Sequence, residues 1–545
     1  MSWRGCWLSR AAPLTGVLRA VDRLAVLNEP EISHHADWAI YPWIPTAGHR
    51  SHWRVRQSGL PPLLHWTEHE RVPGRTAVSD GPARMSSQTD IDSSNPWFRA
   101  SLHLFILVCW IGKTTRRQVL HIALCRRTRL GPSVFTRNVG MQVSYEAAAP
   151  SRLQSALAAL PALAEAIGKD AAQREAKREL PFDGFALFRQ SGLGVLRLPE
   201  EWGGLGGTLE DLFEVVTTLA AHESNVAHAL RIHFDITEAL LLSPRSTFND
   251  TQIERIRAGA IFGGASTEAG TSRPGEITTK LVRDGEHFRI SGRKFYSTGT
   301  AFSDYARINV QDENDENVAI VIPVAREGLQ VLDDWDGMGQ RMTASGSLVL
   351  DNVQVYAHEV ALRGSTTLVG RHGGALRQLH LVAVAAGIVR NVVADAHRYV
   401  TQYGRPVLHS PAPSSREDGF VQQVVGDLAA HSLSIDALVN QNARTLERSA
   451  HAIRQGASDA DERVLEGALA TAKTQLVVSK LALYTAERLF EVGGASATAR
   501  SHNFDRHWRN LRTIFSHNPL LHKARVIGDY ELNGVTTHLK EGRVF

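Results

Sequence analysis

Cysteine is nearly absent from this chain of 545 residues, which has only three. All of them, Cys6, Cys109 and Cys125, precede Met141, and the chain beyond that methionine has none. The long C-terminal part of the protein therefore has no disulfide framework. Its composition fits a reducing compartment and predicts a cytoplasmic location.

Strong net charge is also lacking. The formal net charge of +4 is small for this length, which argues against nucleic acid as the main partner. In residues 1–140 the one apolar run, Leu104 to Ile111, is too short to span a bilayer. We therefore expect neither a nucleic acid nor a membrane as a partner.

The composition changes sharply near Met141. Eight of the eleven tryptophans precede it, and residues 1–140 have no sustained helical or strand period. Arg4, Arg10 and Arg19 precede the first acidic residue of the chain, as is typical of a mitochondrial transit peptide. Such a peptide does not need so long a patternless stretch. We favour an extension outside the fold, either disordered or lying upstream of a natural start at Met141.

Residues 141–260 are predicted to form an N-terminal helical domain. Leucines recur at helical spacing from Leu153 to Leu163, as do the apolar positions of residues 209–221. Between them, residues 203–207 contain four glycines, which indicates a loop with unusual backbone conformations. This loop is not a GxGxxG motif after a strand, so a Rossmann domain is disfavoured.

Two histidines in this domain, His228 and His233, are five residues apart. They do not share a helical face at that spacing, so a metal site is not expected. A single histidine on such a helix is more often a hydrogen-bonded packing residue than a catalyst.

The apolar period changes from about residue 261, and residues 261–362 are predicted to form a compact antiparallel β-domain. Residues 277–282 and 287–290 flank Asp284-Gly285, a dipeptide favoured in hairpin turns. Further apolar segments follow at residues 306–310, 318–324 and 347–350.

The remainder, residues 363–545, is predicted to be a C-terminal helical domain. Residues 374–404 and 418–492 are expected to be helical, with a loop between them. The pair Gly493-Gly494 is expected to end the second block as a C-cap.

Residues 506–519 carry the strongest indication of chemistry. Arg506, Arg509 and Arg512 recur every three residues and would share one helical face. Their planar guanidinium groups suit a phosphate, although a solvated basic face is the alternative. Pro519 cannot continue the helix. His517, which can titrate near neutral pH, would therefore lie at a helix end.

An ordered set of motifs resembles the acyl-CoA dehydrogenase superfamily of flavoproteins over residues 150–545. The motifs lie at Pro199–Gly204, Ala265–Glu268, Ile290–Gly299, Trp335–Ser347, Arg405 and Gly493-Gly494. The resemblance implies an α+β fold with an N-terminal helical domain, a middle antiparallel β-domain and a C-terminal helical bundle.

The resemblance also implies which residues bind the flavin. Small hydroxyl side chains can bond to the flavin ring without crowding it, although any one of them alone is also typical of a turn. Arg405 would bind the flavin phosphate of a neighbouring subunit, which implies a homotetramer. The implied cofactor-binding set is Ser266, Thr267, Ser297, Thr298, Trp335, Arg341, Ser345, Arg405, Gly493, Gly494 and Arg509.

The chain departs from the acyl-CoA dehydrogenases where many of them carry a catalytic glutamate. Aligned on Arg509 and Arg512, their Tyr-Glu-Gly-Thr stretch becomes Phe515-Ser516-His517-Asn518, without a carboxylate. Of these residues only His517 can act as a base at neutral pH. Some family members place the glutamate on an earlier helix.

Residues 506–519 resemble instead the two-component flavin monooxygenase branch, the dibenzothiophene monooxygenase-like and sulfur-acquisition enzymes. That resemblance implies reduced FMN from a separate reductase, its reaction with O2 to a C4a-hydroperoxyflavin, and oxygenation of a small sulfur, nitrogen or aromatic compound. His517 and His228 would be the catalytic histidines, and the Thr298 hydroxyl would face the flavin. Ile232 stands where relatives carry tyrosine, which leaves an aromatic-sulfur substrate open.

Two other functions remain open from the sequence. One is an FAD-dependent acyl-CoA dehydrogenase or oxidase that acts on an acyl thioester. The other is a flavin-free structural homologue, which the retained glycine and arginine loops disfavour.

Overall fold

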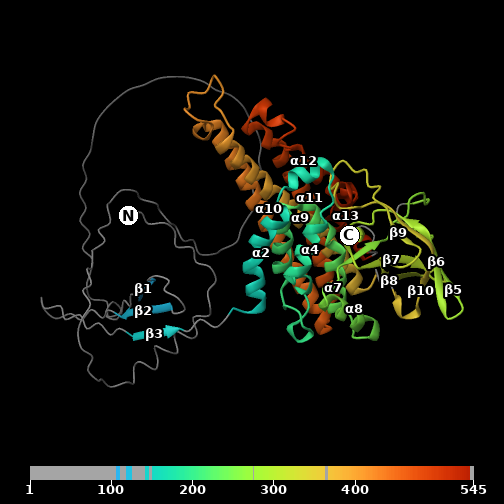
Figure 1. Cartoon of the computed structure of the whole chain (residues 1–545). Coiled ribbons are helices and arrows are strands. Elements are labelled where there is room, and N and C mark those ends of the chain that lie inside the picture. Colours follow the sequence, from blue (N-terminus) through green and yellow to red (C-terminus); the bar gives the residue numbers. More distant parts are fainter. Residues whose placement is uncertain are drawn as a thin grey trace, which may run out of the picture. The chain divides into compact units, whose positions relative to one another are not determined.

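A computed structural model of the chain describes residues 106–110, 118–124, 141–145, 150–273, 275–362 and 366–540 (Figure 1). Three short strands, β1 (Ile106–Trp110), β2 (Gln118–Leu124) and β3 (Met141–Tyr145), pair in this order as an antiparallel sheet. No periodicity in the sequence indicates these strands. The rest of the expected extension, residues 1–140, lies outside the described residues, so its separation from the fold stays a prediction.

Helices make up the N-terminal part, as predicted. The first helix, α2 (Arg152–Gly168), is capped by Ser151. The Ser151 hydroxyl accepts a hydrogen bond from the Gln154 amide at 3.1 Å. In return, the Gln154 side chain accepts a hydrogen bond from the Ser151 amide at 3.0 Å. This reciprocal capping satisfies two backbone donors at the helix start. The helices are α2 (Arg152–Gly168), α3 (Ala171–Lys177), α4 (Phe182–Ser191), α5 (Leu209–His222), α6 (Ser224–Ala229), α7 (Arg231–Leu242) and α8 (Thr247–Arg257).

Two four-stranded sheets form the middle part, with strand orders β5-β6-β10-β9 and β11-β8-β7-β4. The predicted hairpin is present, with Asp284 paired to His287 across its turn. The pairing is antiparallel except between β4 and β7, which run parallel. The strands are β4 (Phe262–Ala265), β5 (Leu281–Asp284), β6 (His287–Lys294), β7 (Tyr305–Gln311), β8 (Asn317–Pro323), β9 (Leu329–Val331), β10 (Leu348–Val355) and β11 (Val360–Leu362).

The C-terminal part is again helical, with one difference from the prediction. The expected block at residues 418–492 is two helices, because Gly456 adopts a φ of 59° and ends the first of them. The second ends at Arg488 and continues as a 3-10 turn, Leu489–Val492, before Gly493. The helices are α9 (Leu368–Gln402), α10 (Gly419–Gln455), α11 (Ala460–Arg488), α12 (Asp505–Ser516), α13 (Leu520–Asn533) and α14 (Thr537–Lys540).

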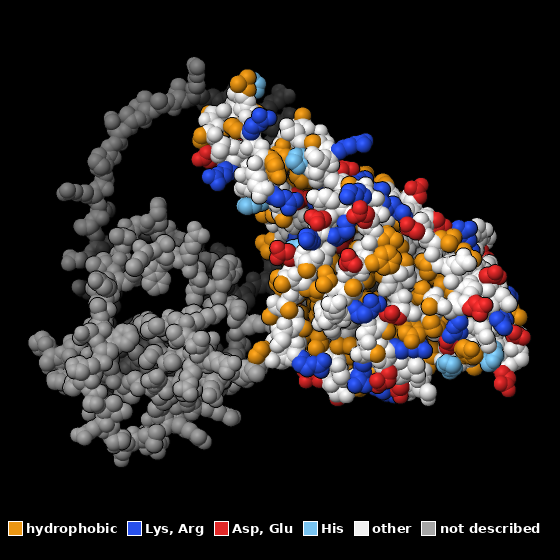
Figure 2. Space-filling model, viewed as in Figure 1, with side chains coloured by type: hydrophobic (Ala, Val, Ile, Leu, Met, Phe, Trp, Pro, Cys, Tyr) orange, Lys and Arg blue, Asp and Glu red, His pale blue; other side chains and the backbone are white. Residues whose placement is uncertain are grey.

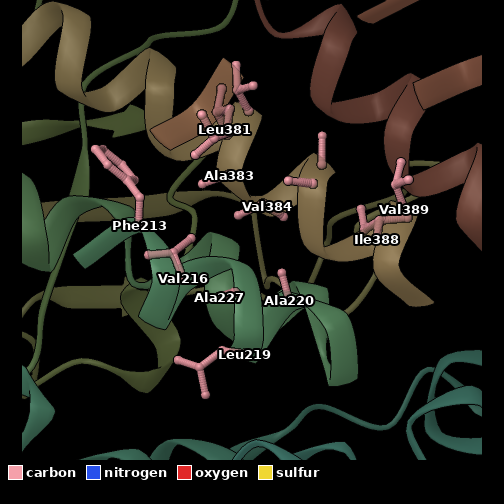
Figure 3. Close-up of a cluster of buried hydrophobic side chains, with 14 of the residues drawn as sticks. Phe213, Val216, Leu219, Ala220, Ala227, Leu381, Ala383, Val384, Ile388 and Val389 are labelled. Atoms are coloured by element: carbon pink, nitrogen blue, oxygen red, sulfur yellow. The ribbon is translucent and has the colours of Figure 1, made fainter. Parts of the chain in front are cut away.

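The helix α9 is the centre of the helical core. It packs against α5, α10 and α11, and Ala383 and Val384 of α9 lie toward Val216 and Ala220 of α5 (Figure 3). By length and composition α9 could cross a bilayer, but 78% of its most apolar window is buried within the fold. A helix that is apolar all round is expected at the centre of a core. We therefore interpret α9 as a core helix of the fold rather than a membrane span.

These layers confirm the predicted α+β fold, with helical regions on both sides of a β-rich middle part in sequence. Figure 2 shows basic and acidic side chains interspersed over the visible face, in keeping with the net charge of +4. The junction between the three parts brings α6, α7, the loop at residues 335–347 and the end of α12 into contact.

Candidate active site

Gln340 joins the three parts of the fold at this junction. Its side-chain oxygen lies 3.0 Å from Nδ1 of His228 on α6, and its side-chain nitrogen donates to the Ser224 hydroxyl at 3.0 Å. Its backbone N–H donates to the Asn510 side chain on α12 at 2.6 Å. Gln340 is buried and has a φ of 50°. A non-glycine residue rarely adopts that conformation unless its surroundings fix it.

The loop that carries Gln340 lies close against α12. A Cβ atom at Gly339 would lie 2.1 Å from the backbone oxygen of Arg509. Any side chain at this position would therefore push the loop away from α12. Glycine is required here for close approach, and this approach places Gln340 on Asn510.

The hydrogen bond to Gln340 sets the protonation state of His228. Because the Gln340 amide nitrogen is directed to Ser224, its oxygen faces His228 and accepts the proton of Nδ1. Burial and the Arg231 charge lower the pKa of His228 well below its ordinary value, so the ring is neutral. Its Nε2 atom is buried and has no hydrogen-bond partner among the described residues.

His517 follows α12 and lies close enough to His228 for their charges to interact. The Asn518 amide nitrogen donates to Gln378, so the Asn518 oxygen, at 3.0 Å, accepts from Nδ1 of His517. Nε2 of His517 accepts a hydrogen bond from Arg231 at 3.3 Å. The side chain is accessible to solvent although protein surrounds it on most sides. This desolvation and the Arg231 charge lower the pKa of His517.

A chain of buried hydroxyl groups includes two of the predicted flavin-binding residues, and a third lies beside it. Thr298 lies 2.7 Å from Ser345, and Ser345 lies 2.6 Å from Thr343. Thr343 donates to the Gln340 carbonyl oxygen at 2.9 Å. The Ser297 hydroxyl donates to the Gly346 carbonyl oxygen at 2.8 Å. The structure thus brings Ser297, Thr298 and Ser345 together beside Gln340.

Trp335 joins the same group, because its indole N–H donates to the Gln340 carbonyl oxygen at 3.0 Å. Ser266 and Thr267 lie at the end of β4. The Ser266 hydroxyl accepts from Asn309 on β7, and the Thr267 carbonyl oxygen accepts from the Phe295 amide at 2.8 Å. Thr267 is therefore bonded to the backbone two residues before Ser297, and Ser266 is bonded to the neighbouring strand β7.

Arg341 and Arg509 converge on Glu175 of α3. Arg509 donates to the Glu175 carboxylate at 2.7 Å, and Arg341 donates to its carbonyl oxygen at 2.9 Å. Burial raises the pKa of Glu175, but hydrogen bonds from Arg509 and Asn503 outweigh it and leave the pKa below its ordinary value. Arg509 thus joins α3 to α12 and Arg341 joins α3 to the loop at residues 335–347, and their expected contact with the cofactor stays a prediction.

The predicted arginine face of α12 is divided, because Arg506 and Arg509 make separate ion pairs and Arg512 makes none among the described residues. Arg506 is buried and donates to Asp395 of α9 at 2.7 Å, and Arg509 binds Glu175. Neither arginine matches the solvated basic face weighed from the sequence. The structure therefore gives Arg506 a structural role at the core of the helical bundle.

The described residues show no contact between Gln340 and Arg405, Gly493 or Gly494. Arg405 is exposed on the loop between α9 and α10, and the described residues offer it no ion pair. A Cβ atom at Gly493 would lie 2.2 Å from the Tyr399 ring, and Gly494 has a φ of 54°. The glycine pair is thus fixed by close approach and backbone conformation, and it borders the end of α9.

The described residues contain no cluster of histidine, cysteine, aspartate or glutamate that could hold a metal ion. His233 is a packing residue, as its spacing suggested, and its Nε2 lies 2.9 Å from the Gly194 carbonyl oxygen. The residues that sequence reasoning missed are Gln340, Ser224, Asn510 and Arg231. Gln340 and Asn510 lie within segments that carry the family resemblance, but nothing in the sequence distinguishes them there, because the contacts of all four residues come from distant segments.

Comparison with known proteins gives this geometry a context. Residues 379–520 match a family model described as acyl-CoA dehydrogenase, C-terminal domain. A protein named probable FMNH2-dependent monooxygenase SfnC, from Pseudomonas putida, is 30% identical over 382 residues, which are 69% of this chain and 95% of that protein. The chain belongs to the family of this monooxygenase. It is a flavin-dependent oxidoreductase of the monooxygenase branch of the acyl-CoA dehydrogenase fold.

Two solved structures of this monooxygenase branch are also similar. FMN-bound TdsC from Paenibacillus sp. A11-2 has a TM-score of 0.65 and 26% identity, covering 70% of this chain and 98% of TdsC. Methanesulfinate monooxygenase MsuC from Pseudomonas fluorescens has a TM-score of 0.63 and 27% identity, covering 70% of this chain and 97% of MsuC.

The residues present fit the flavin that this monooxygenase family uses. Thr298 and Ser345 offer buried hydroxyl groups that can turn toward the polar edge of a flavin ring. The buried Nε2 of His228, which the described residues leave without a partner, is a position where a bound group could donate a hydrogen bond. Exposed Arg405 can bind a phosphate.

Proposed function

We propose that this monooxygenase uses reduced FMN, delivered by a separate flavin reductase, and O2 to oxygenate a small sulfur, nitrogen or aromatic compound. The observation that carries the proposal is the pair of imidazoles, His228 and His517, which both lie close to Arg231 at the junction of the three parts. Reduced FMN, when bound, supplies the electrons that activate O2, and the reaction yields FMN, oxygenated product and water. The chain's own residues must then exclude water and manage protons.

His228 is suited to hold a hydrogen bond at a fixed position. Gln340 accepts the proton of Nδ1, which leaves the lone pair of Nε2 as an acceptor. Ser224 and Asn510 hold Gln340 in turn. We propose that His228 positions the substrate or the oxygen that is transferred to it.

His517 is suited to move a proton because it is accessible while His228 is buried. In the described network Nδ1 carries its proton, and Nε2 accepts from Arg231. A second proton on Nε2 would make His517 the acid that releases water. We propose this acid role for His517 and a flavin-facing role for the Thr298 hydroxyl.

The alternative function, an acyl-CoA dehydrogenase, requires a carboxylate base to remove an α-proton. Asp235, four residues after Arg231 on α7, accepts hydrogen bonds from both Arg307 and Arg377. Burial raises the pKa of Asp235, but these arginines outweigh it and lower the pKa below its ordinary value. Asp235 is therefore a poor base, which favours oxygenation over dehydrogenation.

The names of two similar proteins suggest which class of substrate to test. The similar MsuC is named for methanesulfinate, and TdsC is described as a dibenzothiophene monooxygenase. In this chain Ile232 packs beside Gly264 of β4 and takes no part in a polar network. We propose a small sulfur compound as the first class to test.

We propose that four copies assemble as a pair of dimers in the cytoplasm. The loop with Arg405 also exposes Leu408, and the neighbouring helix α10 exposes Phe420, which is 82% accessible. Large apolar side chains at such positions suit burial against another subunit. Light scattering at micromolar concentration tests this, because a fully active monomer would contradict it.

The functional test compares cofactors and substrates on the purified protein. We expect little bound flavin after purification, oxygenation only when reduced FMN and O2 are supplied together, and no reduction of bound FAD by an acyl-CoA. A protein that binds FAD tightly and bleaches with an acyl-CoA would establish the dehydrogenase alternative instead.

A further inference from the structure

Arg231 is a partly buried cation without a carboxylate partner among the described residues. Among the described residues, the Arg231 side chain makes one hydrogen bond, in which its guanidinium group donates to Nε2 of His517 at 3.3 Å. Its Nε atom is buried and has no acceptor among the described residues. Leaving a charged donor unsatisfied in this way is costly, so the position calls for an acceptor that the described residues do not supply.

The carboxylate one helical turn away from Arg231 is already occupied. Asp235 lies four residues further along α7, where an ion pair with Arg231 would be possible. Instead, Arg377 of α9 donates to one of its oxygens at 2.7 Å, and Arg307 of β7 donates to the other at 2.5 Å. Asp235 thus pairs with two guanidinium groups and leaves Arg231 as a third beside them, so the three arginines exceed this one carboxylate by two positive charges.

The cluster also faces the candidate active site. The charges that act most strongly on His517 are those of Arg231, Lys523 and Arg377, and all of them lower its pKa. Burial, with added repulsion from Arg377 and Arg307, lowers the pKa of Arg231 to about 10, so Arg231 stays charged at neutral pH. Arg307 and Arg377 keep side-chain exposures of 24% and 31%, so their charges reach the solvent side of the cluster.

We propose that the substrate of this enzyme carries a small oxyanion, such as a sulfinate or a carboxylate, and that Arg231 binds it beside His517. The planar guanidinium group suits the two oxygens of such an anion. Arg307 and Arg377 contribute positive potential while they stay bound to Asp235. This inference rests on the proposed function, since it names the substrate class of the same site.

Binding of an anion would also change His517. The groups that face His517 are Arg231 of α7, His228 of α6, Arg377 of α9, and Lys523 with Asn518 beyond α12. An oxyanion that draws the Arg231 guanidinium toward itself removes part of the charge that opposes a second proton on the imidazole. The substrate would thereby enable His517 to act as an acid only when it is bound.

The test uses matched pairs of charged and uncharged probes, measured by calorimetry on the full-length protein without flavin and again with reduced FMN under anaerobic conditions. The pairs are methanesulfinate with dimethyl sulfoxide, benzenesulfinate with methyl phenyl sulfoxide, and benzoate with benzamide. We expect at least one anion to bind more tightly than its neutral counterpart. Arg231→Met should weaken that anion about tenfold or more and leave its neutral counterpart unchanged.

Two further variants keep the result interpretable. Arg231→Lys retains the charge and should keep part of the anion preference, whereas Arg525→Met removes an exposed arginine on α13 and should change nothing. An equal or greater affinity for every neutral probe, or an anion preference that survives Arg231→Met, would overturn the inference. Failure of the proposed function is distinguishable, because it appears as absent oxygenation with reduced FMN whatever the charge of the probe.

Discussion

The side-chain oxygen of Gln340 lies 3.0 Å from Nδ1 of His228, and both groups are buried. This contact joins the loop between β9 and β10 to the first helical part, and it fixes which nitrogen of His228 carries the proton. The remaining polar atoms of Gln340 are also used, so a connected network holds Nδ1 of the imidazole, while Nε2 has no partner among the described residues.

Replacing Gln340 by methionine should disturb catalysis more than it disturbs the fold. The change removes the acceptor for Nδ1 of His228 at similar volume, and it leaves the Ser224 hydroxyl with one donor fewer. We expect a loss of stability of about 1–3 kcal/mol and a larger release of hydrogen peroxide per reduced FMN. Gln422→Met, on the exposed surface of α10, is the control. Unchanged coupling in Gln340→Met would show that His228 does not depend on this contact.

Glu268 should make stability depend on acid pH. It is buried and accepts hydrogen bonds from Lys294, Thr278 and Thr279. Burial raises its pKa, but these bonds outweigh it and lower the pKa from 4.5 to about 2. A carboxylate with a depressed pKa stabilises the fold fully above its unfolded value, and this stability is lost as the pH falls from about 4.5 toward 2.

The corresponding variant is Glu268→Gln, which leaves the Lys294 charge buried without its carboxylate. We expect a destabilisation of about 3–5 kcal/mol at pH 7, measured by denaturant unfolding, that shrinks as the pH falls below about 4.5. Glu316→Gln, on an exposed turn, should have no such effect. A destabilisation by Glu268→Gln that is the same at pH 7 and pH 3 would contradict the assignment.

Much of the fold could be predicted from the sequence, because periodicity reports burial directly. The apolar spacing of residues 209–221 indicated α5, and Asp284-Gly285 indicated the hairpin of β5 and β6. The division of the last helical block at Gly456 was missed because one glycine in a helical pattern does not always end a helix.

The candidate site could be predicted only in part. Resemblance to the family indicated His228 and His517, but no local signal indicated Gln340, whose positive φ comes from tertiary contacts. Arg509 illustrates the limit most clearly. Its spacing suggested a phosphate ligand, whereas in the structure it binds Glu175, which is 334 residues away in sequence.

Arg405 should contribute to FMN affinity through its phosphate. Charge-assisted hydrogen bonds of this kind are worth about 1.5–3 kcal/mol each, so Arg405→Ala should weaken binding of reduced FMN roughly tenfold or more. Anaerobic titration of the flavin measures this. Arg416→Ala, an exposed arginine in the same connecting loop, serves as the control. Tighter binding of FAD that Arg405→Ala leaves unchanged would favour the dehydrogenase alternative.

The extension at residues 1–140 should be dispensable. The helix α2 starts with its own capping box at Ser151, and the helical core is built from residues beyond it. A protein that starts at Met141 should therefore be soluble, and its melting temperature and oxygenation rate should match those of the full chain. A clearly lower melting temperature would mean that the extension is part of the fold.

The central claim is that His517 delivers a proton in an oxygenation that reduced FMN drives. The most direct test is the hydrogen peroxide released per reduced FMN consumed, in the presence of a substrate, for the wild type, for His517→Ala and for the exposed-histidine control His522→Ala. Loss of an acid of this kind typically costs about 10²–10⁴-fold in rate. We predict that His517→Ala binds reduced FMN normally but releases nearly all of the oxygen as peroxide, while the wild type and His522→Ala stay coupled. Full coupling in His517→Ala would contradict the account.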